Sequence, residues 1–325
     1  MNSVYYRGLT SSEPSRPAQM FAGIRKPLIA LFSAVLLAAL AISPSADAKT
    51  KTKKAKAAPA AAAQAYTPPF SALVMDAATG TILMSNSGND LRHPASLTKV
   101  MTLYILFSEL DAGRVDFFDK IKISRHAANQ APSRLGLQPG QSIEVHDAIQ
   151  ALAVKSANDI ATAVGEHLSG SEQAFARRMT ETARRLGMTK TTFLNASGLP
   201  NKEQWTTAHD MAMLGWRMQR DFPEYYSYFN AEKFTWQGQT FYSHNRFMRN
   251  YEGADGLKTG FTNASGFNLV ASADRFGKRL IGVVMGGTTA QARDKKMAQI
   301  FDDVFAQTSR PQKVAGVMMS GHMTP

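Results

Sequence analysis

Ser96 and Lys99 could do chemistry together, because a spacing of three places two side chains one turn apart on the same face of a helix. A serine hydroxyl is a weak nucleophile until a neighbouring base takes its proton. A lysine can be that base when burial lowers its pKa enough for the amine to be neutral near neutral pH. The nearly continuous apolar run from Val100 to Leu106 predicts a buried helix that takes Lys99 into the core. A Ser-x-x-Lys match is expected about once by chance in a chain of this length, so the pair decides nothing alone.

Two further polar motifs follow along the chain. Ser156-Ala157-Asn158 lies at a break between two apolar stretches of helical spacing, where a hydroxyl and an amide can face a cleft. Lys258-Thr259-Gly260 falls inside a predicted strand, and a lysine beside a threonine hydroxyl suits a carboxylate by charge and by hydrogen bond. Gly260 would let a substrate backbone approach closely. Ser-x-Asn also occurs at Ser87-Gly88-Asn89 and Ser243-His244-Asn245, but the first lies too close before the candidate nucleophile and the second lacks the helix break.

The three motifs, in this order, resemble the signature of penicillin-binding proteins and serine β-lactamases. The resemblance covers about residues 66–308, and the combination is far more specific than any one motif. The surrounding residues narrow it to the low-molecular-mass D-alanyl-D-alanine carboxypeptidases. The segments that carry this closer similarity are Pro94–Lys99, Val154–Asp159, Asn195–Pro200, Asp255–Thr262 and Gly266–Ala273.

The resemblance implies catalytic roles at four positions. Ser96 would attack the carbonyl of the penultimate D-alanine of a peptidoglycan stem peptide and become acylated, while Lys99 would take its proton. Ser156 would relay a proton to the leaving amine, and Asn158 would hold the substrate backbone and the lysine. Water would then release the shortened peptide.

The resemblance also implies how the substrate is bound. Lys258 and Thr259, beside Gly260, would bind the terminal carboxylate. The backbone N–H groups of Ser96 and Phe261 would form the oxyanion hole, a feature that typically contributes a few kcal/mol. β-Lactams would inhibit the enzyme, since the ring carboxylate of penicillin mimics that of the D-alanyl-D-alanine peptide. No cofactor is implied.

Three other functions compete with the carboxypeptidase. A DD-endopeptidase that cuts peptidoglycan crosslinks would use the same chemistry, and the sequence separates the two poorly. A β-lactamase is disfavoured, because no Glu-x-x-x-Asn motif of the kind that activates the deacylating water in class A enzymes lies between Asn158 and Lys258. A non-catalytic cell-wall binding module is disfavoured by the presence of every catalytic residue.

The motifs require elements that hold them around one cleft. Strands at the start, helices in the middle and strands with a helix at the end predict an α+β fold. In it, an antiparallel sheet forms from both chain ends, with helices on both sides and a helical subdomain, in the β-lactamase/transpeptidase-like arrangement that the resemblance implies. We predict strands over 72–75, 81–84, 121–124, 234–236, 240–242, 256–261, 267–273 and 279–285, and helices over 96–111, 143–154, 159–167, 173–186, 207–217 and 290–305.

The net charge of +12 is concentrated at the start of the chain, and it therefore does not indicate nucleic-acid binding. Residues 1–56 carry nine basic and two acidic side chains, which leaves a net charge of only +5 for the other residues. Arg25-Lys26, the apolar run 27–42 and Ala46-Asp47-Ala48 predict a signal peptide over 1–48 that is removed after Ala48, and hence export to the periplasm or cell-wall space.

The rest of the chain divides by composition. We predict a disordered Lys/Ala/Pro-rich tether over 49–65, a DD-peptidase catalytic domain over 66–308 and a disordered tail over 309–325. Many members of the family carry a further β domain and a membrane anchor at this end, which we do not expect here. The basic segment Lys49–Lys56 would instead supply a weak electrostatic association with a membrane or the cell wall.

The remaining polar residues give weaker signals. The chain has no cysteine, so thiol chemistry and disulfides are excluded. Its seven histidines form no His-Glu-x-x-His motif or clustered ligand set, and we expect no metal site. His244, upstream of the Lys-Thr-Gly strand, and Arg134, in a turn-rich loop over 131–140, are candidates for the cleft wall.

Overall fold

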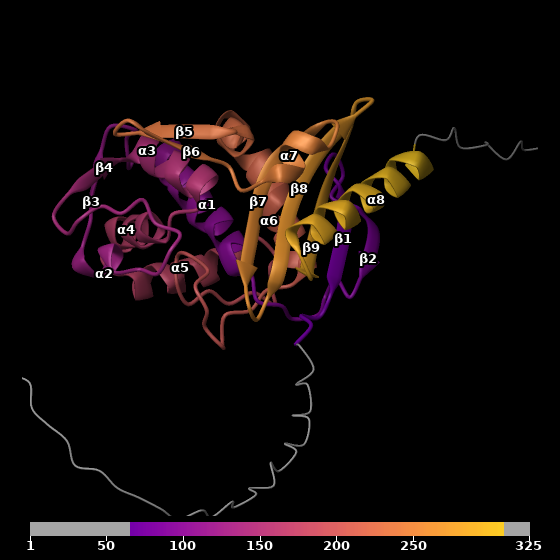
Figure 1. Ribbon diagram of the computed structural model, residues 1–325, viewed down its shortest axis with the longest axis horizontal. Coiled ribbons are helices and arrows are strands. Elements are labelled where there is room, and N and C mark those ends of the chain that lie inside the picture. The colour runs from indigo at the N-terminus through magenta and orange to yellow at the C-terminus, as the bar shows by residue number, and fades with distance from the viewer. Residues whose placement is uncertain (1–65, 309–325) are drawn as a thin grey trace, which may run out of the picture. The chain divides into compact units, whose positions relative to one another are not determined.

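The computed structural model describes residues 66–308, in which both ends of the chain contribute to one antiparallel sheet. The five strands run in the order β2-β1-β9-β8-β7 (Figure 1). They are β1 (Ser71–Asp76), β2 (Ile82–Asn86), β7 (Ala254–Thr262), β8 (Gly266–Arg275) and β9 (Lys278–Gly287). Because β1 pairs with β9, the sheet is complete only when the first and last strands meet. The α+β prediction, with a sheet built from both ends, is confirmed.

The strand residues alternate between two apolar layers, as a sheet covered on both faces requires. Ala72 and Val74 of β1 belong to the cluster that packs on α8 (Ala290–Thr308). Leu73 and Met75 belong to the larger cluster on the other face, which α6 (Ala208–Asp221) covers. Helices therefore lie on both sides of the sheet, as predicted.

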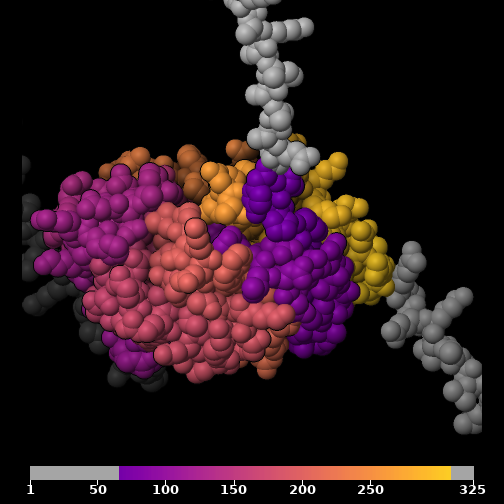
Figure 2. Space-filling view, turned by 90° about the horizontal axis from the view of Figure 1, so that it is seen from below, coloured from indigo at the N-terminus to yellow at the C-terminus, as the bar shows by residue number. Residues whose placement is uncertain are grey.

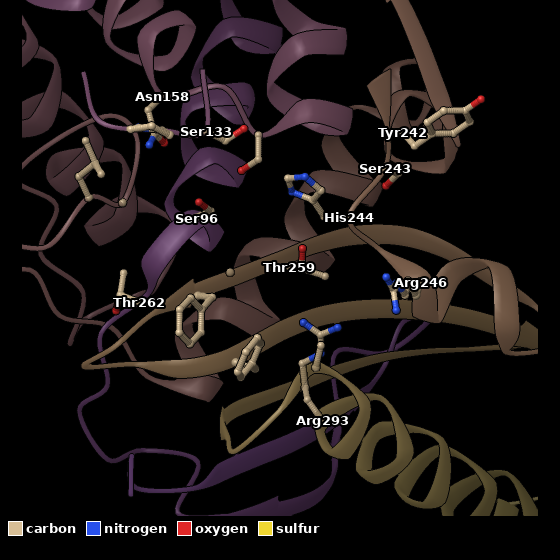
Figure 3. A pocket seen from close by; sticks show the side chains of 18 of the residues that line it. Ser96, Ser133, Asn158, Tyr242, Ser243, His244, Arg246, Thr259, Thr262 and Arg293 are labelled. Atoms are coloured by element: carbon tan, nitrogen blue, oxygen red, sulfur yellow. The ribbon is translucent and has the colours of Figure 1, made fainter. Parts of the chain in front are cut away.

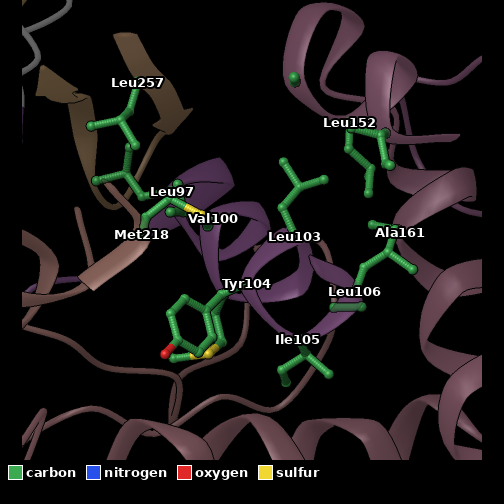
Figure 4. Packing of buried hydrophobic residues seen from close by; sticks show 14 of the residues in the cluster. Leu97, Val100, Leu103, Tyr104, Ile105, Leu106, Leu152, Ala161, Met218 and Leu257 are labelled. Carbon is green, nitrogen blue, oxygen red and sulfur yellow. The ribbon is translucent and has the colours of Figure 1, made fainter. Parts of the chain in front are cut away.

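Helix α1 (Thr98–Asp111) lies inside the larger cluster and connects the sheet to the helical part of the protein (Figure 4). Every residue from Thr98 to Phe107 is buried. A helix that is apolar on all sides is a core helix rather than a surface helix. The predicted burial of the Ser96 helix is therefore correct.

The helical subdomain packs around the far end of α1. It contains α2 (Arg125–Ala128), α3 (Val145–Gln150), the π-helical turn η2 (Ala151–Lys155), α4 (Asn158–Ser169), α5 (Glu172–Arg185), and the strand pair β3 (Lys120–Lys122) and β4 (Ser142–Glu144). A second strand pair, β5 (Lys233–Trp236) and β6 (Gln239–Tyr242), packs on η2. On the face in Figure 2, the indigo N-terminal strands adjoin the pink segment near residue 200, in agreement with the bridge between Arg92 and Thr206.

The prediction of one helix over 143–154 is wrong in two respects. Ile143 lies in β4, where it pairs with Ile121 of β3, and three-residue strands are too short to display an alternating pattern. The helix then begins at Val145 and widens into η2 before the Ser-x-Asn motif. The sequence analysis also missed α2, the 3₁₀ helix η3 (Pro223–Asn230) and α7 (Arg246–Asn250).

The predicted signal peptide (1–48), tether (49–65, with Lys49–Lys56) and tail (309–325) lie outside the described residues. Between residues 66 and 308, none of the helices combines the length and apolar character needed to cross a membrane.

Gly282 of β9 provides a test of the packing between the sheet and α8. A Cβ atom there would lie 2.4 Å from Cε1 of Phe301 and 2.6 Å from Sδ of Met297. We expect Gly282→Ala to lower the free energy of unfolding by about 1–3 kcal/mol, because overpacking displaces α8. Urea unfolding measures this change. In the control, Phe301→Leu makes room for the new methyl group. The double variant Gly282→Ala/Phe301→Leu should therefore lose less free energy of unfolding than the two single variants lose in sum. If Gly282→Ala were as stable as wild type, the tight packing of β9 against α8 would be contradicted.

Candidate active site

Ser96 lies in a short 3₁₀ turn, η1 (Ala95–Leu97), that leads directly into α1. Two glycines allow other segments to press against this turn. A Cβ at Gly198 would lie 1.8 Å from the carbonyl oxygen of Ala95, and a Cβ at Gly260 would lie 3.0 Å from the backbone nitrogen of Ser96. Gly260 therefore lets β7 reach the serine turn itself. This differs from the expected reason for the glycine, which was close approach of a substrate.

Asn268 of β8 fixes the backbone just before the serine. Its Nδ2 donates to the carbonyl oxygens of His93 (3.0 Å) and Pro94 (3.3 Å), and its Oδ1 accepts from the backbone N–H of Gly286 (3.1 Å). The side chain is fully buried, so these bonds are shielded from water. The sequence analysis did not identify Asn268, because nothing local distinguishes it from any other strand residue.

Lys99 is fully buried directly behind Ser96. Its Nζ lies 3.2 Å from Oγ of Ser96, 2.6 Å from Oδ1 of Asn158 and 2.6 Å from the carbonyl oxygen of Ser197. Burial, reinforced by the charge of Lys258 and partly opposed by that of Asp159, holds the pKa of Lys99 well below its usual value. A neutral amine has two N–H donors, which the two carbonyl-type oxygens can accept. Its lone pair is then available to the serine hydroxyl.

The carbonyl of Ser197 is held in place through the residue before it, Ala196. The backbone N–H of Ala196 donates to Oε1 of the buried Glu172 (3.1 Å), and its carbonyl oxygen accepts from Oγ1 of Thr102 (2.6 Å). Both backbone polar groups of Ala196 are thus satisfied inside the protein, which orients the next carbonyl, that of Ser197, toward Lys99. The position of Glu172 on α5 links the helical subdomain to the serine turn.

The Ser-x-Asn motif lies where η2 gives way to α4. Ser156 has a left-handed backbone (φ 60°) that ends η2, and Asn158 is the first residue of α4. Nδ2 of Asn158 donates to the carbonyl oxygen of Ala131 (2.8 Å), which leaves its Oδ1 facing Lys99. The buried Asp159 accepts from backbone N–H groups of the loop that covers this side of the cleft, including that of Gly136 (2.8 Å).

The Lys-Thr-Gly motif lies in β7, one of the two edge strands of the five-stranded sheet. Burial, together with the charge of Arg293, lowers the pKa of Lys258 to about 7. Its Nζ is 3.2 Å from the carbonyl oxygen of Thr259. Phe261 is half exposed, and its ring packs on that of Phe267 at a centroid distance of 4.3 Å.

The motifs meet around an open cleft of about 640 Å³ (Figure 3). Six of the eight predicted site residues line it: Ser96, Ser156, Asn158, Thr259, Gly260 and Phe261. Lys99 and Lys258 lie buried behind the lining residues. His244 lines the cleft as well, whereas Arg134 is not a lining residue and donates instead to the carbonyl oxygen of Ala128 (3.2 Å).

The cleft also contains residues that the sequence analysis did not identify, namely Tyr242, Arg246, Arg249 and Arg293. Tyr242 ends β6, Arg246 and Arg249 lie on α7, and Arg293 lies on α8. Only the tertiary fold brings these elements to the Lys-Thr-Gly strand. In residues 66–308, no group of three or more His, Asp or Glu side chains is arranged to hold a metal ion.

Solved structures share this fold. D-alanyl-D-alanine carboxypeptidase DacD from Francisella tularensis superposes with a TM-score of 0.70 and 32% identity, covering 73% of this chain and 69% of that chain. Penicillin-binding protein D2 from Listeria monocytogenes, in its ampicillin-bound form, gives a TM-score of 0.64 and 28% identity over 72% of this chain and 96% of that chain. The fold is therefore that of the β-lactamase/transpeptidase class.

Sequence comparison identifies the family within that class. Residues 52–289 match the peptidase S11 family, described as D-alanyl-D-alanine carboxypeptidase, and the chain belongs to this family. It is 33% identical over 245 residues to D-alanyl-D-alanine carboxypeptidase DacF of Bacillus subtilis, and 35% identical over 228 residues to DacC of Escherichia coli. These matches cover 73% and 68% of this chain but 62% and 57% of the relatives, so the chain spans less than two thirds of their length. The resemblance noted in the sequence is confirmed.

The lowered pKa of Lys258 makes the stability of the protein pH-dependent. The pKa of Lys258 is about 7 in the folded state and 10.5 ordinarily. At pH values between these two, the unfolded chain binds more protons than the folded protein, so the free energy of unfolding rises with pH. Lys258→Met removes this contribution. From pH 7 to pH 9, we expect the free energy of unfolding of wild type to rise by about 2 kcal/mol relative to that of the variant. Urea unfolding at each pH measures this change. Parallel pH profiles for the two proteins would rule out the lowered pKa.

Proposed function

We propose that the protein is a serine DD-carboxypeptidase that removes the terminal D-alanine from peptidoglycan stem peptides through an acyl-enzyme on Ser96. The observation that carries the proposal is the arrangement around Lys99: a buried amine with two carbonyl-type acceptors and the serine hydroxyl 3.2 Å away. This arrangement suits a neutral base that takes the serine proton at the moment of attack. Membership of the peptidase S11 family supports the substrate class.

In the proposed first step, Oγ of Ser96 attacks the carbonyl carbon of the penultimate D-alanine and its proton passes to Lys99. The N–H groups of Ser96 and Phe261 would stabilise the oxyanion. The carbon–nitrogen bond then breaks, and a proton returned through the hydroxyl of Ser156 leaves with the amine of the released D-alanine. A water molecule subsequently attacks the ester and regenerates the serine.

The substrate would lie along β7. We propose that Lys258 and Thr259 bind its terminal carboxylate, and that Asn158 holds both its backbone and the lysine base. The nearby charge of a carboxylate favours the protonated form of Lys258, whose pKa of about 7 lets binding itself charge the side chain. β-Lactams would occupy the same cleft and acylate the same serine. The endopeptidase and the non-catalytic binding module are not favoured.

Intact-mass analysis after incubation with benzylpenicillin tests the nucleophile. We expect one covalent adduct on wild type and none on Ser96→Ala. Lys99→Met should slow acylation by about 10²–10⁴-fold, because it removes the base while keeping the apolar stem. The exposed Lys122→Ala serves as a control and should react like wild type. The rate of D-alanine release from an acyl-D-Ala-D-Ala peptide should rank in the same way: Lys122→Ala equal to wild type, Lys99→Met slower, and Ser96→Ala without activity.

The other outcomes are equally informative. An unmodified protein with intact penicillin would favour the binding module, and rapid turnover of penicillin without a lasting adduct would favour a β-lactamase.

We further propose that the protein is exported and that its mature form begins at Lys49. The support is the sequence pattern of residues 1–48. Lys49–Lys56 would then provide weak contact with an anionic membrane or cell wall. Protein recovered from the periplasm should have the intact mass of the chain beginning at Lys49, and a mass that retains residues 1–48 would contradict removal.

A further inference from the structure

A second cavity lies away from the cleft, toward the C-terminal end of α1. It has a volume of about 320 Å³ and is lined by residues of α1, α5 and α6. None of its lining residues also lines the active-site cleft. Ser108, at its wall, comes nine residues after Lys99, which corresponds to about 14 Å along the helix axis. A ligand of this cavity is therefore separate from the substrate of the proposed reaction.

Three arginine side chains converge on this cavity, which we call the arginine pocket. Arg178 and Arg185 lie on α5, where a spacing of seven puts them on one face of the helix, and Arg217 lies on α6. The polar residues that line the pocket are Tyr104, Ser108, Arg178, Thr182, Arg185 and Arg217. No Asp or Glu of residues 66–308 is among the lining residues. The pocket is thus lined by cations and hydroxyl groups without an acidic residue.

Arg178 has an ion pair but keeps a free donor. Its Nη2 contacts Oε1 of Glu109, and its Nη1 donates to the carbonyl oxygen of Leu168 (3.4 Å). Glu109 also accepts from Nε and Nη2 of Arg114 (2.7 and 3.0 Å). The hydrogen bonds from Arg114 and then from Arg178 lower the pKa of Glu109 to about 2, against the effect of burial. One carboxylate therefore serves two arginines, and Nε of Arg178 has no partner within residues 66–308.

Arg217 shares its acidic partner as well. Its Nε donates to Oδ2 of Asp221 (2.8 Å), and the same oxygen accepts from the hydroxyl of Tyr104 (2.5 Å). Neither Nη group of Arg217 has a hydrogen-bond partner in the part of the chain that the structure describes. Because 33% of this side chain is exposed, its donors are accessible to a ligand in the pocket.

Arg185 has no ion pair among the described residues. Its one hydrogen bond runs from Nη2 to Oγ1 of Thr182 (2.8 Å). Glu181, four residues before it, is exposed, forms no ion pair and does not line the pocket. A cation in the last turn of α5 suits the helix dipole, which accounts for an arginine at this place in the helix. The dipole does not account for Arg178 and Arg217 at the same cavity, where like charges repel one another unless an anion lies between them.

The charges of the pocket and of its ion-pair partners do not balance. Two carboxylates, those of Glu109 and Asp221, are present for four guanidinium groups, which are those of Arg114, Arg178, Arg185 and Arg217. The excess of two positive charges is close to the charge of a phosphate monoester. A tetrahedral phosphate can accept from guanidinium groups on several sides at once, whereas a carboxylate carries one charge and lies in one plane.

We propose that the arginine pocket binds a phosphate dianion, either inorganic phosphate or the terminal group of a phosphate monoester. The free donors of Arg178, Arg185 and Arg217 would hold its oxygens, so that the anion joins α5 to α6 beside the C-terminal half of α1. This site is independent of the proposed hydrolase function, and its test needs no turnover of substrate.

Isothermal titration calorimetry in a phosphate-free buffer tests the pocket, with inorganic phosphate, sn-glycerol 3-phosphate and acetate as probes. For wild type, we expect saturable binding of inorganic phosphate that is about tenfold tighter than binding of acetate. The affinity should fall as sodium chloride is added. Absence of phosphate binding up to about 10 mM, or equal affinities for phosphate and acetate, would overturn the inference. Binding of glycerol 3-phosphate as well would assign a monoester to the pocket, and its exclusion would assign the free ion.

Two arginine variants of α5 connect the binding to the pocket. Arg185→Gln should weaken phosphate binding by about tenfold, the usual effect of one charged hydrogen bond. Arg177→Gln removes the same charge from an exposed neighbouring position that does not line the pocket, and it should bind phosphate like wild type. Thermal unfolding in the phosphate-free buffer verifies that both variants are folded. Unchanged binding in Arg185→Gln, or an equal loss in both variants, would contradict the pocket.

A third variant separates the pocket from the active-site cleft. Lys258→Met removes a cation behind the cleft lining and should bind phosphate as tightly as wild type, since Lys258 is not a residue of the arginine pocket. Loss of phosphate binding in this variant would place the anion in the cleft and refute the inference. Failure of wild type to react with penicillin would refute the proposed function alone, because phosphate binding is measured without it.

Discussion

The site depends on the burial of one amine among carbonyl oxygens. A charged ammonium group is costly in an apolar interior, and Lys99 is carried on a helix that is buried on every side. The 2.6 Å contacts to Asn158 and to the carbonyl oxygen of Ser197 satisfy the donors that a neutral amine retains. These acceptors come from different elements, so the base beside Ser96 acquires its properties only when the helical subdomain has packed around α1.

The sheet and the helices pack closely at the serine turn because two glycines and one hydrogen-bonded asparagine lie there. Gly198 and Gly260 leave no Cβ where the backbone of Ala95 and Ser96 must pass. The buried amide of Asn268 ties the two carbonyls before the turn to the sheet. The nucleophile is therefore held by backbone contacts on both sides, which keeps its hydroxyl in position without the loss of entropy that a mobile loop would incur.

The electrostatics of the cleft have one sign. Burial lowers the pKa of Lys99 and of Lys258, with a further contribution from the charge of Lys258 to the first and of Arg293 to the second. Arg293 itself already has Asp294 as a partner. The guanidinium groups of Arg246 and Arg249 on α7, which have no hydrogen bond or ion pair within residues 66–308, add further positive charge to the cleft.

The sequence by itself determined the three motifs and their order, the start of the helix at the nucleophile, and the strands at both ends of the fold. Those features rest on local spacing and on the alternation of apolar residues, which neighbouring residues alone specify. Tertiary structure decided the rest: that Glu172 and Thr102 orient the carbonyl facing Lys99, that Asn268 fixes the serine turn, and that α7 brings two arginines into the cleft. It also decided that 143–154 divides into a strand, a helix and a π-helical turn, because Ile143 finds its partner only across β3. Each of these depends on contacts between segments distant in sequence, and the pKa of a buried group follows from its neighbours in space rather than in the chain.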